Sequence, residues 1–271
     1  MRALWTAASG MTTQQTNVDT ISNNLSNINT IGFKKEAAQF KTLLYQTIQK
    51  QQTDSEGNEK PIGAQVGLGV KTAAIRSVFT QGTYTETGND SDFAIDGDGF
   101  FVIQLPDGSL GYTRSGSFQW AIDEEGLTLA TSDGNPVLDS NGQPIIIDST
   151  KYTASDITID ANGYVCYPDA QNNAQSVGIQ IGLVQFNNPS GLLKMSGSIL
   201  KETNASGEAV FETSADSITK SKVRQGYLEA SNVDAVEEMV NLIVAQRAYE
   251  MNSKVITASD EMLKQANNLR G

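Results

Sequence analysis

The sequence contains no histidine and a single cysteine, Cys166. An intrachain disulfide needs two thiols, a zinc site of the Cys/His type needs several ligands, and histidine acid/base catalysis needs an imidazole, so all three are excluded. Cys166 lies in an apparent strand, where a small, partly buried apolar side chain is a better interpretation than a nucleophile. Together with the short motifs discussed below, these absences lead us to predict no catalytic residue, no metal site, no cofactor and a non-enzymatic function.

Basic residues are also scarce in the middle of the chain, and long apolar runs are missing throughout. Residues 92–189 contain 13 Asp and Glu but only 2 Lys and Arg, whereas the remainder, with 18 and 17, is close to neutral. Without clustered basic residues we expect no nucleic-acid binding. No run approaches the roughly 18 to 20 apolar residues of a membrane-spanning helix, and no cleavable signal peptide is visible, so we expect no membrane insertion.

Several short motifs resemble ligand sites but lack the required spacing. Asp96-Gly-Asp-Gly99 and residues 133–142 do not place oxygen donors as an EF-hand calcium loop does. Residues 63–69 have spaced glycines without a following Gly-Lys-Ser/Thr. Glu124 and Glu125 are adjacent, so on a strand they would face opposite ways, unlike a glycosidase pair. Turn chemistry explains these motifs better than binding does.

A seven-residue repeat predicts a helix at the N-terminal end. Its positions in the first thirty residues are Leu4, Met11, Val18 and Leu25, with Ala7, Gln14, Ile21 and Ile28 three positions further on. Such a repeat is typical of a helix that packs against another helix. The segment Asn29-Thr-Ile-Gly32 contains residues that commonly end helices.

A second helix is predicted at the C-terminal end. Residues 231–234 resemble a capping box that opens at Ser231, and no Gly or Pro follows until Gly271. Its apolar repeat is Val244, Ala248, Met251, Val255, Ala258 and Met262. A helix of this length would be about 57 Å long, too long to be covered by one small subunit. It therefore needs partners, unless the two terminal helices simply pair with each other in a monomer.

Between the helices, period-two runs and turn signals predict short strands in a small β-barrel or sandwich. The turns are expected at Asp107-Gly108, Asp133-Gly134, Asn141-Gly142 and Asn162-Gly163. Residues 46–63 and 201–217 are polar and turn-rich, which is typical of disordered linkers. The predicted fold is α+β, with long terminal helices in a coiled-coil-like domain and an inserted β-rich domain. Its three parts are residues 1–36 with 226–271, residues 37–91 with 190–225, and the acidic residues 92–189.

Longer passages resemble the signatures of the flagellar rod and hook protein family. Residues 19–34 carry Asn-Asn-Leu and then Asn27-x-x-Thr-x-Gly-Phe-Lys34, and residues 225–254 are similar to the C-terminal signature of that family. Asp98-Gly-Phe-Phe101, Leu105-Pro-Asp-Gly108 and Tyr112-Thr-Arg114 extend the similarity to nearly the whole chain.

The resemblance implies a structural subunit that polymerises with itself. Terminal helices would form the inner layer around an export channel, and the β-rich domain would lie outermost. Proximal-rod and hook-family subunits, the flagellar export apparatus and a bushing ring around the rod are the implied partners. The implied location is the basal body, in the cell envelope outside the cytoplasmic membrane, after type III export without cleavage.

The chain length and Leu44-Tyr-Gln-Thr-Ile48 favour the distal rod within this family. In distal-rod proteins an insertion after the first helix is associated with a straight rigid tube. Residues 45–61 match it by position and through Tyr45, Gln46, Thr47 and Ile48. A proximal-rod or hook subunit is the alternative, and a secreted binding module or enzyme with helical termini is the alternative from another class.

Two sets of helix residues are predicted to act in assembly. The predicted subunit-packing residues are Leu4, Met11, Val18, Ile21, Leu25, Val244, Met251, Val255 and Met262. The predicted polar contacts between helices are Asn23, Asn24, Asn27, Gln246, Arg247 and Tyr249. Each could instead be an ordinary exposed helix residue. We also expect the terminal helices to be poorly ordered before assembly and to become ordered by burial against neighbouring subunits.

Overall fold

The computed structural model describes residues 2–49, 64–123, 126–148, 153, 156–168, 174–214 and 218–269. The chain divides into two compact units. The helical unit comprises residues 1–26, 36–77 and 234–271, and the β-rich unit comprises residues 27–35 and 78–233. Both long terminal helices belong to one unit, so the predicted α+β fold is confirmed. The predicted three-part division stays a prediction.

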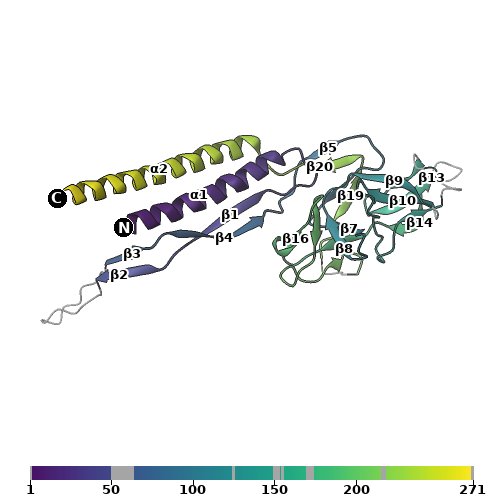
Figure 1. Cartoon of the computed structure of the whole chain (residues 1–271). Coiled ribbons are helices and arrows are strands. Elements are labelled where there is room, and N and C mark those ends of the chain that lie inside the picture. The colour runs from purple at the N-terminus through teal and green to yellow at the C-terminus, as the bar shows by residue number, and fades with distance from the viewer. Residues whose placement is uncertain are drawn as a thin grey trace. The chain divides into compact units, whose positions relative to one another are not determined.

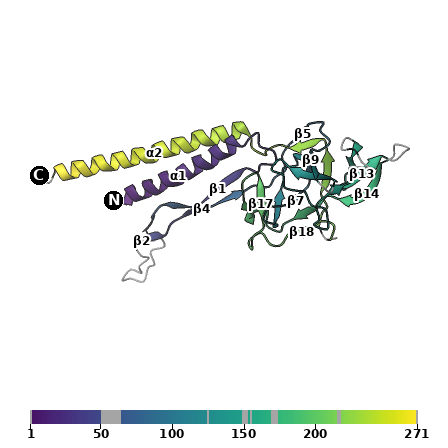
Figure 2. The same cartoon turned by 45° about the vertical axis from the view of Figure 1, so that its right-hand side comes forward.

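The helical unit is built on two antiparallel helices that lie side by side (Figures 1 and 2). Helix α1 spans Arg2–Ser26, and helix α2 spans Ala235–Asn268. The predicted start of α2 at Ser231 is wrong, because Asp234 is the residue that caps it. The Asp234 carboxylate accepts hydrogen bonds from the backbone N–H groups of Val236 and Glu237, which would otherwise have no partner in the first turn.

The two helices meet along a line of small and polar residues. A Cβ atom built at Gly10 of α1 would lie 2.9 Å from the amide nitrogen of Asn252 in α2. Glycine at this position therefore lets the two helices approach closely. Two heptads further along both helices, the Asn24 amide donates a hydrogen bond of 3.1 Å to Glu238. The buried residues of α2 are Glu238, Ala245 and Ser259. They share a seven-residue spacing with Asn252, and this line is offset by one residue from the apolar repeat at Val244 and Met251.

A β-ribbon completes the helical unit (Figure 1). Its strands are β1 (Glu36–Thr42), β2 (Tyr45–Gln49), β3 (Ala64–Gly67) and β4 (Val70–Ser77), paired antiparallel as β1–β4 and β2–β3. The linker prediction is therefore wrong for residues 46–49, and residues 50–63 lie outside the described part of the chain. Helix α1 packs on β1 and β4.

One of the spaced glycines in residues 63–69 permits this packing. Gly69 has a φ of +119°, and a Cβ atom there would lie 2.2 Å from the Ser9 hydroxyl oxygen of α1. That hydroxyl oxygen accepts a hydrogen bond from the backbone N–H of Val70. The glycine is therefore needed for contact between the ribbon and α1.

The β-rich unit consists of small antiparallel sheets. Its strands are β5 (Tyr84–Glu86), β6 (Phe93–Asp96), β7 (Phe100–Gln104), β8 (Leu110–Thr113), β9 (Phe118–Asp123), β10 (Gly126–Thr131), β11 (Ile146–Ile147), β12 (Thr158–Ile159), β13 (Tyr164–Pro168), β14 (Ala174–Gln180), β15 (Leu183–Gln185), β16 (Leu193–Lys194), β17 (Ile199–Lys201), β18 (Val210–Phe211), β19 (Lys222–Gln225) and β20 (Tyr227–Glu229), with a 3-10 turn η2 (Pro189–Gly191). Among the described residues the largest sheet has the order β16-β17-β8-β7-β15-β18. The pairs β19–β6 and β20–β5 bring late strands onto early ones.

The predicted turns in this unit are confirmed. Gly108, Gly134, Gly142 and Gly163 all have φ values between +76° and +82°, the left-handed region that favours glycine. The Asp107-Gly108 turn joins the paired strands β7 and β8, and the Asn162-Gly163 turn joins β12 and β13. The linker prediction for residues 201–217 is wrong where β17 and β18 lie, and residues 215–217 fall outside the described part.

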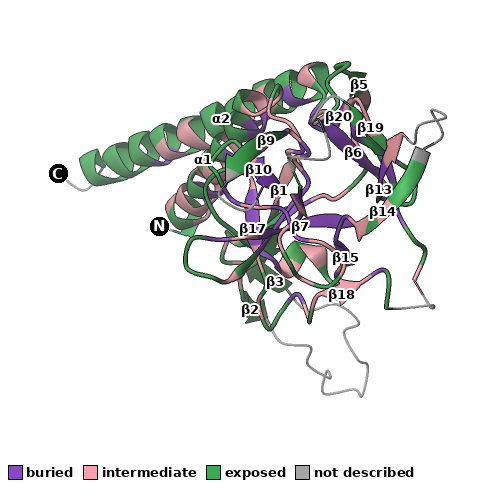
Figure 3. Cartoon of the chain, turned by 90° about the vertical axis from the view of Figure 1, so that its right-hand side faces the viewer, coloured by how far each residue is buried: buried purple, intermediate pink, exposed green. Residues whose placement is uncertain are grey.

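Strand β7 lies between two hydrophobic clusters, which explains its continuous apolar run. Phe101 and Ile103 point into one cluster, while Phe100 and Val102 point into the other. All four side chains are buried, as the purple colour of β7 in Figure 3 indicates. The Phe101 ring also meets the Phe118 ring edge to face, with centroids 5.1 Å apart. This packing makes β7 the centre of the unit.

Candidate assembly surface and buried charge cluster

Helix α2 exposes most of its apolar side chains. We define the exposed stripe as Val240, Val244, Met251, Val255 and Met262, whose exposed fractions run from 45% to 63%. Successive residues on an α-helix are about 100° apart, so this stripe lies roughly 100° round the helix from the line that contacts α1. The predicted subunit-packing residues of α2 therefore do not make the helix contact within the chain. They form a second face, which the chain leaves open.

The predicted residues of α1 are more covered, because this helix is packed by both α2 and the ribbon. Ile21 is buried, while Leu4, Met11, Val18 and Leu25 are half-buried. Val18 and Gln15 line one groove with Gln246, Tyr249 and Glu250 of α2. The groove thus brings together three of the predicted assembly residues, Val18, Gln246 and Tyr249.

Asn24 joins three elements of the helical unit. Its side-chain amide donates hydrogen bonds to the Glu36 carbonyl and to the Glu238 carboxylate, and its carbonyl oxygen accepts one from the Glu36 N–H at 2.8 Å. Asn23 is exposed and donates to the Glu36 carboxylate. Asn27 belongs to the β-rich unit, where its side chain accepts a hydrogen bond from the Thr30 hydroxyl. The three asparagines therefore lie in different surroundings.

The other predicted polar and ribbon residues are exposed. Gln246 and Arg247 lie on the surface of α2, and Arg247 forms a 2.8 Å ion pair with Glu250 one turn away. Exposed pairs of this kind contribute little to stability. In β2, Tyr45, Gln46, Thr47 and Ile48 are all exposed. The Tyr45 ring covers Gly67 of β3.

A buried charge cluster in the β-rich unit was not predicted. The Glu229 carboxylate is fully buried and accepts hydrogen bonds from the Lys34 ammonium at 2.5 Å and from Arg114 Nε at 3.1 Å. Both basic side chains are about 5% exposed. A buried carboxylate needs paired charges and hydrogen bonds to offset its lost hydration, and the cluster supplies both.

The charges of the cluster are also bonded to the backbone. The Lys34 ammonium donates to the Thr80 carbonyl, and the Glu229 carboxylate accepts from the Gly82 N–H, each at 2.8 Å. The Arg114 guanidinium donates to the carbonyls of Gly97 and Gly99. Burial lowers the pKa of the Lys34 ammonium, and the neighbouring Arg114 lowers this pKa further, although Glu229 opposes both effects.

Gly32 fits against the backbone beside this cluster. Its φ is +68°, and a Cβ atom at this position would lie 2.6 Å from the Ser115 nitrogen. The Gly32 N–H donates a hydrogen bond to the Glu229 carbonyl at 2.8 Å. Any side chain here would push apart the backbone segments that the cluster joins. The structure therefore requires glycine at position 32.

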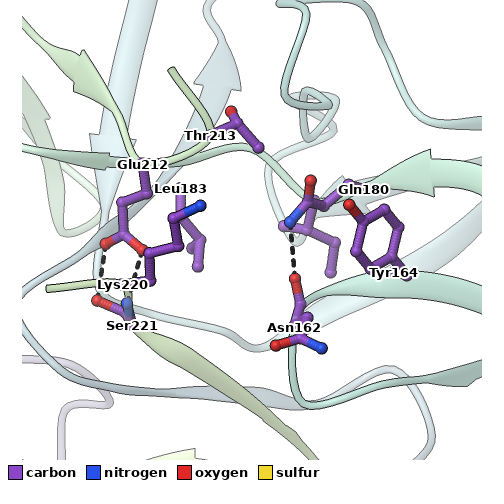
Figure 4. Close-up of a pocket in the computed structure, with 9 residues that line it drawn as sticks. Asn162, Tyr164, Gln180, Leu183, Glu212, Thr213, Lys220 and Ser221 are labelled. Carbon is purple, nitrogen blue, oxygen red and sulfur yellow. Dashed lines mark hydrogen bonds between the residues drawn. The ribbon is translucent and has the colours of Figure 1, made fainter. Parts of the chain in front are cut away.

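The Asp96-Gly-Asp-Gly99 turn is held from its other side by Ser221 and Glu212. The Glu212 carboxylate accepts hydrogen bonds from the Ser221 N–H and hydroxyl, both at 2.7 Å, as Figure 4 shows. The Ser221 hydroxyl oxygen in turn accepts from the Gly99 N–H. Glu212 also borders a small pocket with Tyr164 and Gln180. The glycines of the turn therefore permit close contacts.

Sequence reasoning missed the roles of Lys34, Arg114 and Glu229 although all three lie in the family-like passages. One signal was available for Arg114, which is one of only two basic residues in the acidic stretch 92–189. A lone arginine among carboxylates and apolar strands favours a buried ion pair over a solvated side chain. No group of three or more His, Cys, Asp or Glu side chains that could hold a metal occurs in the described ranges.

Three family models match separate parts of the chain. The model described as flagella basal body rod protein matches residues 4–34, and the model of the flagellar hook protein FlgE/F/G D1 domain matches residues 94–167. The model of the flagellar basal body rod FlgEFG protein C-terminal matches residues 224–269. The fold and these matches define a protein of the flagellar rod and hook class.

Full-length relatives give the particular family. The flagellar basal-body rod protein FlgG of Borreliella burgdorferi is 48% identical over 272 residues, covering 100% of this chain and 99% of the relative. The FlgG protein of Caulobacter vibrioides is 46% identical over 273 residues with complete coverage of both. The flagellar hook-basal body complex protein FlhP of Bacillus subtilis is 34% identical over 277 residues, again with complete coverage.

The chain belongs to the FlgG family of flagellar basal-body rod proteins. This is a structural family, so its membership confirms the prediction of a non-enzymatic function. In the described part of the chain, neither helix is long and apolar enough to cross a membrane.

Proposed function

We propose that the chain is the structural subunit of the distal rod and polymerises with copies of itself into a straight tube. The tube transmits motor torque to the hook and encloses the export channel. The observation that carries this proposal is the exposed stripe of α2. The buried residues of this 34-residue helix are Glu238, Ala245 and Ser259, so most of its large apolar side chains are left for neighbouring subunits.

The exposed stripe can supply the energy of assembly. Complete burial of an apolar side chain contributes about 1.5 to 3 kcal/mol, and the five stripe residues are about half exposed. Burial of their exposed parts would contribute roughly 5 kcal/mol per subunit, before the cost of association. The exposed Leu44, Tyr45 and Ile48 on the ribbon add further apolar surface. Many such contacts along a helical polymer give a stable tube.

The charge distribution supports the proposed radial order. Residues 92–189 lie in the β-rich unit and carry 13 acidic against 2 basic residues, while the rest of the chain is nearly neutral. Neutral helices can pack densely at a small radius because few like charges meet there. An acidic unit is better placed outside, where water and counter-ions reach it.

The proposed partners are copies of the chain, proximal-rod and hook-family subunits, the export apparatus and a bushing ring. The subunit reaches the basal body, outside the cytoplasmic membrane, through the flagellar type III apparatus without cleavage. Imaging a labelled copy along the basal body separates the distal rod from the proximal-rod and hook alternatives. A label between the proximal rod and the hook is the expected result, and a label within either of them refutes the distal assignment.

The substitution Val255→Asp tests the role of the exposed stripe. Val255 is 45% exposed, so the change should leave the β-rich unit folded, but it places a charge in the proposed subunit contact. We expect loss of rod assembly and motility. Ile122→Asp is the matched control, because Ile122 is 85% exposed on β9 of the β-rich unit. Normal rods from Val255→Asp, or equal loss from Ile122→Asp, would refute the assignment.

A further inference from the structure

The polypeptide passes between the two units at four places. The crossings follow Ser26, Lys35, Ser77 and Val233. On the side of the β-rich unit, these crossings adjoin three segments, residues 27–35, 78–83 and 229–233. If the three segments were not bonded to one another, each could move independently. The hydrogen bonds among them therefore determine how rigidly the chain is held where it leaves the β-rich unit.

Asn232 joins all three segments through one side chain. Its carbonyl oxygen accepts a 2.7 Å hydrogen bond from the backbone N–H of Lys35. Its amide nitrogen donates to the Val78 carbonyl at 2.8 Å and to the Thr80 hydroxyl at 2.9 Å. A planar amide with these partners fixes the spacing of the segments.

Backbone hydrogen bonds connect the same segments in pairs. The Gly32 N–H donates to the Glu229 carbonyl, and the Val78 N–H donates to the Lys35 carbonyl. The Ala230 N–H donates to the Thr83 carbonyl at 2.8 Å. None of these three N–H groups is bonded to the Asn232 side chain. Their hydrogen exchange therefore measures the opening of the network and not the loss of a bond to Asn232 itself.

The buried charge cluster closes the network from the other side. Lys34 lies in the first segment, its acceptor Thr80 lies in the second, and Glu229 lies in the third. The Arg114 guanidinium anchors Glu229 to the turn at residues 97–99 of the same unit. The three segments are thus attached to each other and to the core of the β-rich unit.

We propose that residues 27–35, 78–83 and 229–233 form one clamp that opens and closes as a single cooperative unit. Asn232 and Glu229 are its positioning residues. Every connection to the helical unit then starts from one rigid base, and the clamp passes twisting force between the units. This mechanical role rests on the rod function proposed above, whereas the cooperativity of the clamp does not.

Hydrogen exchange on the unassembled full chain tests the clamp through Asn232→Ala. We expect the amides of Gly32, Val78 and Ala230 to exchange faster by one common factor of about 10 to 100, because several hydrogen bonds are lost together. The core amide of Val137, bonded to the Leu129 carbonyl, should keep its protection. The matched control is Asn188→Ala, which removes one amide bond to the Ala205 carbonyl elsewhere in the unit.

Three results would overturn the clamp. The Lys35 amide alone could accelerate, the three reporter amides could change by unrelated factors, or Val137 could accelerate as much as they do. The measurement needs no polymer, so its failure leaves the rod function standing.

The mechanical role is tested with the same variant in cells. We expect rods to form and swimming speed to fall more in viscous medium than in dilute medium, relative to the parent. An unchanged speed ratio would overturn the transmission role. If the variant forms no rods, the clamp is needed for assembly, and the proposed role in force transmission is also overturned.

Discussion

Replacement of Glu229 by Gln is expected to destabilise the β-rich unit strongly. The substitution keeps the shape of the side chain but removes the negative charge that faces Lys34 and Arg114, whose side chains are only about 5% exposed. Removal of one partner from a buried ion pair costs about 3 to 5 kcal/mol, because the remaining charge is left buried without compensation. In a unit of this size that corresponds to a fall in melting temperature of roughly 10 °C.

Tryptophan fluorescence can follow this unit by itself. The two tryptophans are Trp5, exposed on α1, and Trp120, which packs against the main core of the β-rich unit. A Trp5→Phe background therefore leaves Trp120 as the reporter. Glu86→Gln is the matched control, because it makes the same change at an exposed position of β5, the strand that pairs with β20.

Two measurements test the role of the cluster: the loss of stability in Glu229→Gln and its energetic coupling to Lys34. Glu86→Gln should change the free energy of unfolding by no more than about 0.5 kcal/mol. The double variant Lys34→Met with Glu229→Gln should be destabilised by less than the sum of the single variants, because they share one interaction. A melting temperature for Glu229→Gln within about 2 °C of the parent would show that the cluster is not an energetically coupled site.

Three further predictions follow from the structure. In a urea titration, Gly32→Ala should lower the free energy of unfolding by about 3 kcal/mol or more, because φ is +68° and the new Cβ atom would clash with backbone. Gly108→Ala should lower it by only about 1 kcal/mol, because φ is +76° there but the space around the new Cβ atom is open. Burial and Glu202 raise the pKa of Tyr112 to about 12, so the folded state keeps a proton that the unfolded chain releases above pH 10. The unfolding free energy should thus fall between pH 10 and 12 by up to about 3 kcal/mol, and Tyr112→Phe should flatten this slope. Circular dichroism of dilute monomer should show less helix than α1 and α2 contain, and full helix content would contradict assembly-coupled ordering.

Local signals in the sequence were sufficient for the two terminal helices and for the glycine turns, but not for strand β2. Asp-Gly and Asn-Gly pairs identified turns because glycine alone readily adopts positive φ, which Gly108 and Gly163 confirm. The apolar run in β7 is typical of a strand, but its burial between two hydrophobic clusters is a property of the folded unit. The start of α2 was misplaced because Ser231 and Asp234 are both good caps, and only the backbone path decides between them.

The line of contact between the helices could not be predicted from an apolar repeat. The sequence pointed to the repeat at Val244 and Met251, but α2 meets α1 through Glu238, Ala245 and Asn252. Small and polar residues make this contact because Gly10 and Asn24 permit close approach and hydrogen bonding. The apolar repeat of α2 therefore lies on its exposed face and not on the face that contacts α1.

The sequence by itself excluded histidine catalysis, an intrachain disulfide and a zinc site of the Cys/His type, because it contains no histidine and one cysteine. It also determined the terminal helices and the turns, which depend on neighbours a few residues apart. Only the tertiary structure decided which charges are buried together. Lys34, Arg114 and Glu229 are far apart in the chain, and Glu229 is positioned by strands that pair residues 222–229 with residues 84–96, so no local pattern contains the cluster.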